Sequence, residues 1–376
     1  IAEAVMKMCF GNSLGFKFAG NLTANEIFGY CYGGFLLEVA EDIADAAEIG
    51  EITADGKISY NGEEICLERL LEIYENKLES VYRCNKENPN TEMQTFSYTA
   101  ENRVSPAVKT AKPKVLIPVF PGTNCEYDSA KAMRDAGAEP EIFVINNRSA
   151  ENVAKSVEDF ANSLKTAQMV FIPGGFSGGD EPDGSGKFIT AFFRNAAVKE
   201  QVTDLLDNRD GLMCGICNGF QALIKLGLVP YGKIIDTDES CPTLTYNTIA
   251  RHQSKIVRTR IASNKSPWLA DTEVGDIYSV PISHGEGRFI ASDELILRLA
   301  ENGQIATQYV DEKGQAASDI HFNPNGSYYA IEGITSPDGR VFGKMGHSER
   351  YAADLYKNVP GNYDIKMFRS AVKYFK

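Results

Sequence analysis

A cysteine at the end of an apolar stretch is the first residue that suggests chemistry. The stretch 213–221 reads M-C-G-I-C-N-G-F-Q and passes directly into a helical pattern. Cys217 falls at the junction, where Gly215 and Gly219 permit the close packing of a sharp strand-to-helix turn. The helix N-terminus should lower the pKa of the thiol and put the Asn218 N–H where an oxyanion would form. We interpret Cys217 as a nucleophile, the alternative being a buried structural cysteine.

A cysteine nucleophile needs a base, usually a histidine that a third group holds in its productive tautomer. His347 and Glu349 offer such a pair, because residues two apart in extended chain point to the same side. His284 and Glu286 have the same spacing. Spacing alone therefore leaves both histidines open as the base.

A glycine-rich segment, 173–180, reads P-G-G-F-S-G-G-D and follows another apolar strand. Its N–H groups should lie at the carboxyl edge of a parallel sheet, where such folds bind ligands. The segment lacks the Gly-Lys-Ser/Thr ending of a Walker loop and the G-x-G-x-x-G pattern. We interpret it as an oxyanion hole or substrate cradle; the alternative is a plain glycine-rich loop.

The elements that must position these residues alternate between short apolar strands and helices, which predicts a parallel sheet covered on both faces. The predicted strands are 115–120, 141–145, 169–173 and 211–216, and the predicted helices are 128–136, 150–164, 188–206 and 218–226. Beyond Val229 the pattern turns to strands and hairpins. We predict an α/β, doubly wound, mostly parallel sheet with an antiparallel extension, spanning 113–376.

The first 84 residues predict a separate, small α+β piece. The expected elements are a strand at 32–40, a helix at 43–49, a hairpin or meander at 51–64 and a helix at 67–81. Asp55-Gly56 and Asn61-Gly62 are the turn dipeptides of the hairpin. The polar stretch 85–112, with three prolines in or next to it, reads as a linker.

Composition narrows the class of protein. The 376 residues carry a formal net charge of −13, which disfavours nucleic acid as a partner. No apolar run reaches the ~18 residues of a membrane helix and no signal-peptide pattern begins the chain, so we expect a cytoplasmic protein without a membrane partner. The eight cysteines then read as reduced thiols, and the lone C-x-x-C at 214–217 lacks a second ligand pair, so we expect no metal. The chain begins without methionine inside a helical pattern, and we interpret it as a fragment.

Five ordered motifs resemble the glutaminases of the phosphoribosylformylglycinamidine synthase family, which are class I glutamine amidotransferases. The motifs are F-P-G-T-N-C-E at 120–126, P-G-G-F-S at 173–177, G-I-C-N-G-F-Q at 215–221, S-H-G-E-G-R-F at 283–289 and G-H-S-E-R at 346–350. The resemblance implies a flavodoxin-like sheet and covers residues 114–351. Ser348 departs from it, because the family often has proline there.

The resemblance also implies roles for particular residues. His347 and Glu349 align with the family's catalytic histidine and glutamate, so the implied triad is Cys217, His347 and Glu349. The Gly175 and Asn218 N–H groups would form the oxyanion hole. Other residues implied to bind substrate are Gly174, Gln221, Ser283, His284 and Gly285. Cys125 is the other cysteine in a loop expected to approach this site.

Residues 1–84 resemble, more weakly, the end of the synthase portion in long fused forms, through Y-G-G-F-L-L-E-V at 32–39 and I-G-E-I-T at 49–53. The partners implied are glutamine and the remainder of the synthase, with its formylglycinamide ribonucleotide and ATP sites. No cofactor is implied for this chain; ATP and Mg belong to the full-length enzyme. Two alternatives stay open, a cysteine hydrolase or chaperone of the DJ-1-like type and a non-catalytic docking fragment.

Overall fold

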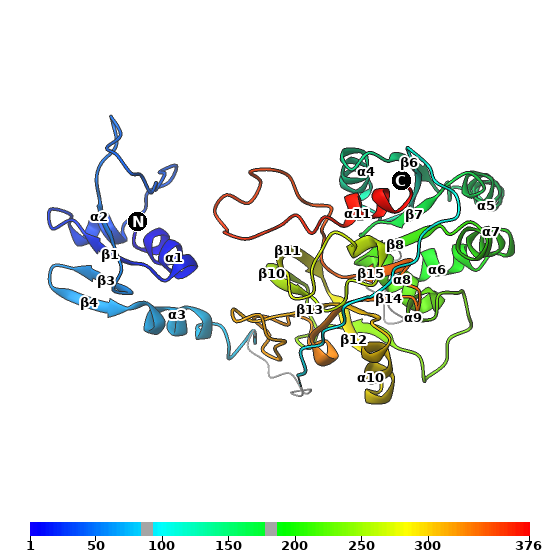
Figure 1. The fold of residues 1–376 in the computed structure, drawn as a ribbon. Helices are drawn as coiled ribbons and strands as arrows, with labels where there is room; N and C mark the ends of the chain where they lie inside the picture. Colours follow the sequence, from blue (N-terminus) through cyan, green and yellow to red (C-terminus); the bar gives the residue numbers. More distant parts are fainter. Residues whose placement is uncertain (84–92, 177–185) are drawn as a thin grey trace. The chain divides into compact units, whose positions relative to one another are not determined.

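The computed structural model describes residues 1–83, 93–176 and 186–376 (Figure 1). The chain divides into two compact units, Ile1–Asn85 and Lys86–Lys376. In the part of the chain that is described, no helix has both the length and the apolar character needed to cross a membrane.

The first unit is a small four-stranded sheet with helices. Its strands β1 (Gly15–Phe18), β2 (Gly50–Thr53), β3 (Lys57–Tyr60) and β4 (Glu63–Cys66) have the order β2-β1-β3-β4, and its helices are α1 (Ala2–Asn12), α2 (Ala24–Phe28) and α3 (Leu67–Asn76). Strands β3 and β4 form an antiparallel hairpin at Asn61-Gly62, where both residues have positive φ angles, as such turns require. The predicted hairpin is confirmed at this turn. β1 lies between β2 and β3, so 51–64 is no simple meander.

Two predictions for this unit are wrong. Residues 32–40 form no strand and residues 43–49 no helix. Most apolar side chains of this segment are exposed, Phe35 to 93%, whereas Leu36 and Ile49 are half-buried against the core of this unit. An apolar run becomes a strand only where another strand pairs with it, and among the described residues no strand pairs with 32–40.

The second unit contains a nine-stranded sheet, ordered β11-β10-β13-β14-β15-β8-β7-β5-β6. The strands are β5 (Lys114–Val119), β6 (Glu139–Val144), β7 (Met169–Ile172), β8 (Leu212–Ile216), β10 (Gln253–Ile261), β11 (Ile277–His284), β13 (Ile305–Tyr309), β14 (Ile331–Thr335) and β15 (Val341–Lys344). The run from β15 to β6 is parallel, and the strands from β14 to β11 pair antiparallel. The predicted mostly parallel, doubly wound sheet with an antiparallel extension is confirmed.

Helices and a small second sheet complete this unit (Figure 1). The helices are α4 (Glu126–Asp135), α5 (Ala150–Leu164), α6 (Lys187–Phe193), α7 (Ala196–Asp207), α8 (Asn218–Leu226), α9 (Leu228–Tyr231), α10 (Asp293–Glu301) and α11 (Met367–Tyr374), with 3-10 turns η1 (Pro267–Leu269) and η2 (Tyr328–Ala330). Strands β9 (Thr243–Tyr246) and β12 (Glu286–Ile290) form the second sheet. The helix predicted over 188–206 is two helices, because the Asn195 side chain accepts the Ala197 N–H and caps α7.

The structure also corrects the expected linker. Residues 93–112 are part of the second unit, and Phe96 is buried in its core. The Phe96 N–H donates to Oε1 of Gln308 at 2.8 Å, and Nη1 of Arg260 donates to the Phe96 carbonyl at 2.6 Å. Burying an aromatic ring stabilises by about 2 kcal/mol, so this polar, proline-containing stretch is anchored despite its composition.

Candidate active site

Cys217 lies at a tight corner between β8 and α8, with φ 53° and ψ −107°. Both flanking glycines are required there. A Cβ on Gly215 would lie 2.5 Å from the Gly219 carbonyl carbon, and one on Gly219 would lie 2.1 Å from the Ile172 oxygen. The predicted strand-to-helix turn is confirmed, and its unusual backbone angles are typical of a strained functional position.

The pKa of Cys217 differs from the expectation. The side chain of Cys217 is buried, and burial raises its pKa to about 12, although a hydrogen bond from the Asn218 backbone acts to lower it. Sγ also lies 3.8 Å from the carbonyl oxygen of Ser283. The expected lowering of the Cys217 pKa is therefore wrong: burial outweighs the helix N-terminus and favours the thiol form.

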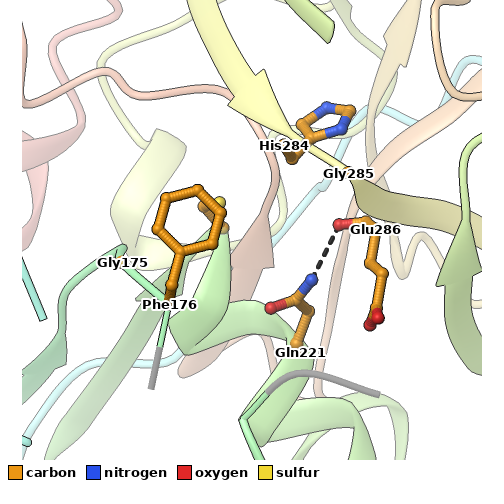
Figure 2. Close-up of a pocket in the computed structure, with 7 residues that line it drawn as sticks. Gly175, Phe176, Gln221, His284, Gly285 and Glu286 are labelled. Atoms are coloured by element: carbon orange, nitrogen blue, oxygen red, sulfur yellow. Dashed lines mark hydrogen bonds between the residues drawn. The ribbon is translucent and has the colours of Figure 1, made fainter. Parts of the chain in front are cut away.

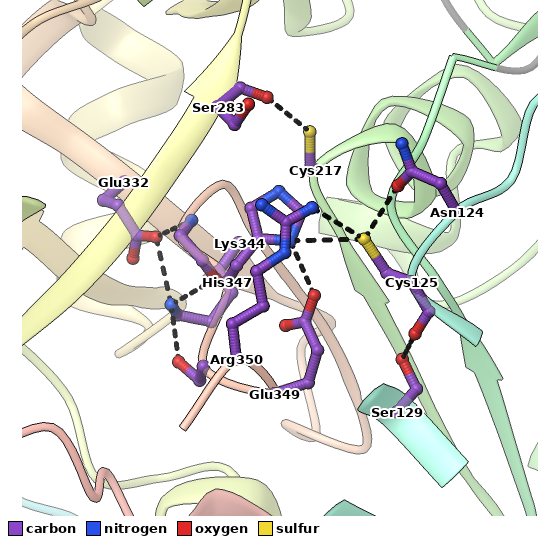
Figure 3. Close-up of polar contacts among 12 residues, drawn as sticks. Asn124, Cys125, Ser129, Cys217, Ser283, Glu332, Lys344, His347, Glu349 and Arg350 are labelled. Carbon is purple, nitrogen blue, oxygen red and sulfur yellow. Dashed lines mark hydrogen bonds and ion pairs between the residues drawn. The ribbon is translucent and has the colours of Figure 1, made fainter. Parts of the chain in front are cut away.

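His347 and Glu349 follow β15 and form a buried pair (Figure 3). Nδ1 of His347 lies 2.6 Å from Oε1 of Glu349, and the His347 N–H donates to the Pro281 carbonyl at 2.9 Å. Burial by itself raises the pKa of Glu349, but the charge of His347 and the hydrogen bond with it outweigh burial and bring the pKa below its ordinary value. The carboxylate thus stays ionised and fixes the ring orientation, leaving Nε2 without a hydrogen-bond partner among the described residues.

The sheet brings this pair to Cys217. β15 runs parallel to β8, with Lys344 opposite Ile216, so both strands end at the same edge. A Cβ built on Gly174, at the end of the adjacent β7, would lie 2.6 Å from Cε1 of His347 and 3.4 Å from Cβ of Cys217. In Figure 3 the His347 ring stands between Glu349 and Cys217. The arrangement is that of a nucleophile, a base and an orienting carboxylate.

The rival base has a different environment. Nδ1 of His284 lies 3.2 Å from Oδ1 of Asn247, so its ring is oriented by an amide. Burial, followed by the charges of His347 and His252, lowers the pKa of His284 to about 3. A ring with so low a pKa is a weak base and is poorly suited to take the proton of a thiol.

A small cavity adjoins Cys217, and its wall includes several of the residues implied to bind substrate. Its lining consists of Gly175, Phe176, Cys217, Gln221, His284, Gly285 and Glu286. Figure 2 shows the Gln221 amide pointing to the backbone of Glu286, and its Nε2 donates to the Glu286 carbonyl at 2.7 Å. Oε1 of Gln221 accepts from Nδ2 of Asn218 at 2.9 Å. Gln221 therefore ties the helix that follows the nucleophile to the opposite wall of the cavity.

Ser283 and Gly174 lie near the cavity without lining it. Oγ of Ser283 is 3.0 Å from Nε2 of His252, and its carbonyl faces Cys217. Gly174 provides the close approach to His347 described above.

The candidate oxyanion donors meet near the nucleophile. Gly175 has φ 146°, and a Cβ there would lie 2.4 Å from the Gly122 oxygen, so only glycine fits without rearrangement. The Phe176 N–H donates to the same oxygen at 2.8 Å, which ties this segment to the loop after β5. Asn218 is the first residue of α8, where N–H groups have no acceptor within the helix. Residues 177–180 of the glycine-rich segment lie outside the described residues.

Cys125 approaches the site as predicted, and it brings a residue that sequence reasoning did not assign. Its Sγ lies 3.8 Å from Nδ1 of His347 and accepts from Nη2 of Arg350 at 2.9 Å. Burial raises the pKa of Cys125 to about 12. The only sequence signal for Arg350 was its place at the end of the G-H-S-E-R motif.

Cys125, His347 and Glu349 offer donor atoms within 4.8 Å of one another. In tetrahedral zinc sites such atoms lie roughly 3.3 Å or more apart, because each is about 2 Å or more from the ion. Here Nδ1 of His347 and Oε1 of Glu349 bond directly to each other at 2.6 Å. This geometry fits an oriented base and does not fit a zinc ligand set.

Comparison with known proteins agrees with this geometry. Residues 112–375 match the family described as CobB/CobQ-like glutamine amidotransferase domain. The chain is 37% identical over 257 residues to phosphoribosylformylglycinamidine synthase subunit PurQ of Methanococcus maripaludis, covering 68% of this chain and 87% of that protein. It is 32% identical over 250 residues to the Aquifex aeolicus protein of that name, covering 66% and 95%. A solved structure, PurLQS from Thermotoga maritima, is similar with a TM-score of 0.51 and 26% identity, covering 70% of this chain and all of that one.

Proposed function

This chain belongs to the CobB/CobQ-like glutamine amidotransferase family, and we propose that it is the glutaminase of a phosphoribosylformylglycinamidine synthase. The carrying observation is the buried His347–Glu349 pair, bonded at 2.6 Å at the sheet edge where β8 delivers Cys217. Its relatives are named as subunits of that synthase, which supports glutamine as the substrate and a role in de novo purine biosynthesis.

The first half of the reaction transfers the glutamyl group to sulfur. The Cys217 thiol passes its proton to Nε2 of His347 while Sγ bonds to the side-chain carbonyl carbon of glutamine. Negative charge moves to the amide oxygen, where the Gly175 and Asn218 N–H groups stabilise it. His347, oriented by Glu349, then returns the proton to the nitrogen; the C–N bond breaks and ammonia leaves.

The second half releases glutamate. The γ-glutamyl thioester is attacked by water, whose proton goes to the same histidine. The C–S bond breaks, and the Cys217 sulfur recovers a proton. The same histidine therefore takes and returns a proton in both halves.

The ammonia is consumed by the synthase. We propose that it passes to a site where ATP, with Mg, activates the amide oxygen of formylglycinamide ribonucleotide, giving formylglycinamidine ribonucleotide. The partners of this chain are then glutamine and the remainder of the synthase. The relatives' description as subunits and the PurLQS structure support the partnership.

Labelling with a diazo-ketone analogue of glutamine tests this function. The expected result is stoichiometric modification of Cys217, located by mass spectrometry, with protection by glutamine and release of ammonia from glutamine. Modification elsewhere, or esterase or glyoxalase activity without glutaminase activity, would favour the DJ-1-like alternative. Absence of both labelling and ammonia release would favour a docking role.

A further inference from the structure

A buried ion pair lies directly beneath the loop that carries the catalytic pair. Lys344 in β15 and Glu332 in β14 are both fully buried, with Nζ 3.2 Å from Oε1. The other carboxylate oxygen accepts from the Thr307 hydroxyl. Burying two charges carries a large desolvation cost, and replacement by apolar residues is often neutral for stability. The pair therefore calls for a reason other than stability.

The pair bonds to the residues on either side of His347 (Figure 3). Nζ of Lys344 donates to the Gly346 carbonyl at 2.8 Å and to Oγ of Ser348 at 3.0 Å. Oε1 of Glu332 accepts the Gly346 N–H at 2.6 Å. Gly346 precedes His347, and Ser348 separates it from Glu349, so the pair restrains the chain where both catalytic side chains leave the backbone.

Glycine at 346 makes this contact possible. A Cβ there would lie 2.8 Å from both methyl groups of Val280 and 3.0 Å from Oε1 of Glu332. The loop thus packs between β11 and the carboxylate without side-chain bulk of its own. After β15 ends at Lys344, the ion pair adds side-chain hydrogen bonds to the backbone bonds from Met345 N–H to the Glu332 carbonyl and from His347 N–H to the Pro281 carbonyl.

We propose that Lys344 and Glu332 are positioning residues that hold His347 and Glu349 in register with Cys217. This inference rests on the proposed glutaminase function. The Lys344 backbone carbonyl accepts the Cys217 N–H at 2.9 Å, a contact that replacing the side chain leaves in place. The charged groups of the pair act on the geometry of proton transfer through Gly346 and Ser348. Their loss should slow the chemical step and leave glutamine binding unchanged, because the cavity lining belongs to other segments.

The decisive variant replaces both charges, Glu332→Met with Lys344→Met. Methionine approximates the volume of each side chain, so the fold should persist while every side-chain hydrogen bond from the pair to the loop is lost. The matched control is Lys114→Met with Glu141→Met, which removes a half-exposed ion pair between β5 and β6 of the same sheet.

The measurement is the rate of Cys217 alkylation as a function of the concentration of the diazo-ketone analogue, which gives a binding constant and a maximal rate. Urea unfolding is measured in parallel. We expect the double variant to lose roughly tenfold or more in the maximal rate, with the binding constant within about twofold of the parent. The control pair should retain both constants.

Variants at Ser348 test the inference even if the double variant fails to fold. Ser348→Ala removes only the hydroxyl that accepts from Lys344 and should lower the maximal rate about threefold, whereas Ser348→Thr keeps a hydroxyl and should retain it. A stably folded double variant that is alkylated at the parent rate would overturn the inference, as would equal rates for the alanine and threonine variants. Failure of the parent chain itself to be labelled at Cys217 would instead refute the glutaminase proposal.

Discussion

The His347 ring packs against the Gly174 backbone so closely that a Cβ on Gly174 would lie 2.6 Å from Cε1. Gly174 is not among the residues with positive φ, so alanine there is excluded by space and not by backbone conformation. Glycine at position 174, after β7, is therefore required for the observed position of the His347 ring.

Gly174→Ala should therefore lower glutaminase kcat by roughly 10²-fold, because the ring has to shift away from Cys217. Steady-state ammonia release measures it. Gly11→Ala is the control, since a Cβ at Gly11 would meet no atom within 4 Å. Unchanged turnover in Gly174→Ala would mean that His347 is free to move without loss.

The two buried cysteines near His347 should behave differently. Cys217→Ala or Cys217→Ser should abolish glutaminase activity while leaving ammonia-dependent synthesis in the complete synthase, because only the corner residue can attack the amide. Cys125→Ala should retain activity. An essential Cys125 with a dispensable Cys217 would move the nucleophile to the sulfur that lies 3.8 Å from Nδ1 of His347.

Separate kinetic constants should distinguish the two histidines. His347→Ala should lower kcat by roughly 10²-fold or more, the scale of a lost general acid-base. His284→Ala should act mainly on KM, because His284 lines the cavity and its ring is held by Asn247. The opposite pattern would make His284 the base.

Stability should depend on pH through His284. Its folded pKa, about 3, lies below its ordinary value of 6.5, so its contribution to stability is complete above pH 6.5 and is lost as pH falls toward 3. Between pH 7 and pH 5 the parent should lose about 2 kcal/mol more than His284→Gln, because only the unfolded parent gains that proton. Urea unfolding followed by the fluorescence of the buried Trp268 measures the difference. An equal pH dependence in both proteins would contradict the neutral, buried state of this ring.

Glutamine hydrolysis should be coupled to the synthase. Hydrolysis without an acceptor wastes glutamine, so alignment of the site is expected to depend on occupancy of the ammonia-consuming site. The chain alone should react covalently at Cys217 yet turn glutamine over slowly, and adding the rest of the synthase with its nucleotides should raise kcat. Steady-state ammonia release under both conditions is the measurement, and equal rates would remove the coupling while leaving the triad untouched.

Features that depend on neighbours along the chain could be predicted from the amino-acid sequence. The strand-to-helix corner at Cys217, the H-x-E spacing of His347 and Glu349, and the helices 150–164 and 218–226 follow from local pattern, and the structure reproduces their bounds. The order of the elements also predicted the doubly wound sheet, because parallel strands joined by helices have few other ways to pack.

How these parts meet could not be predicted and is seen in the folded chain. The tertiary structure inserts β15 beside β8, it orients His284 with Asn247, and it anchors 93–112 on the second unit through Phe96. It also reverses the expected pKa shift of Cys217, because burial outweighs the helix N-terminus. Strand pairing and desolvation arise from residues far apart in sequence, so local spacing carries no information on them. The Lys344–Glu332 pair under the catalytic loop has the same origin, since it exists only once β14 and β15 are paired.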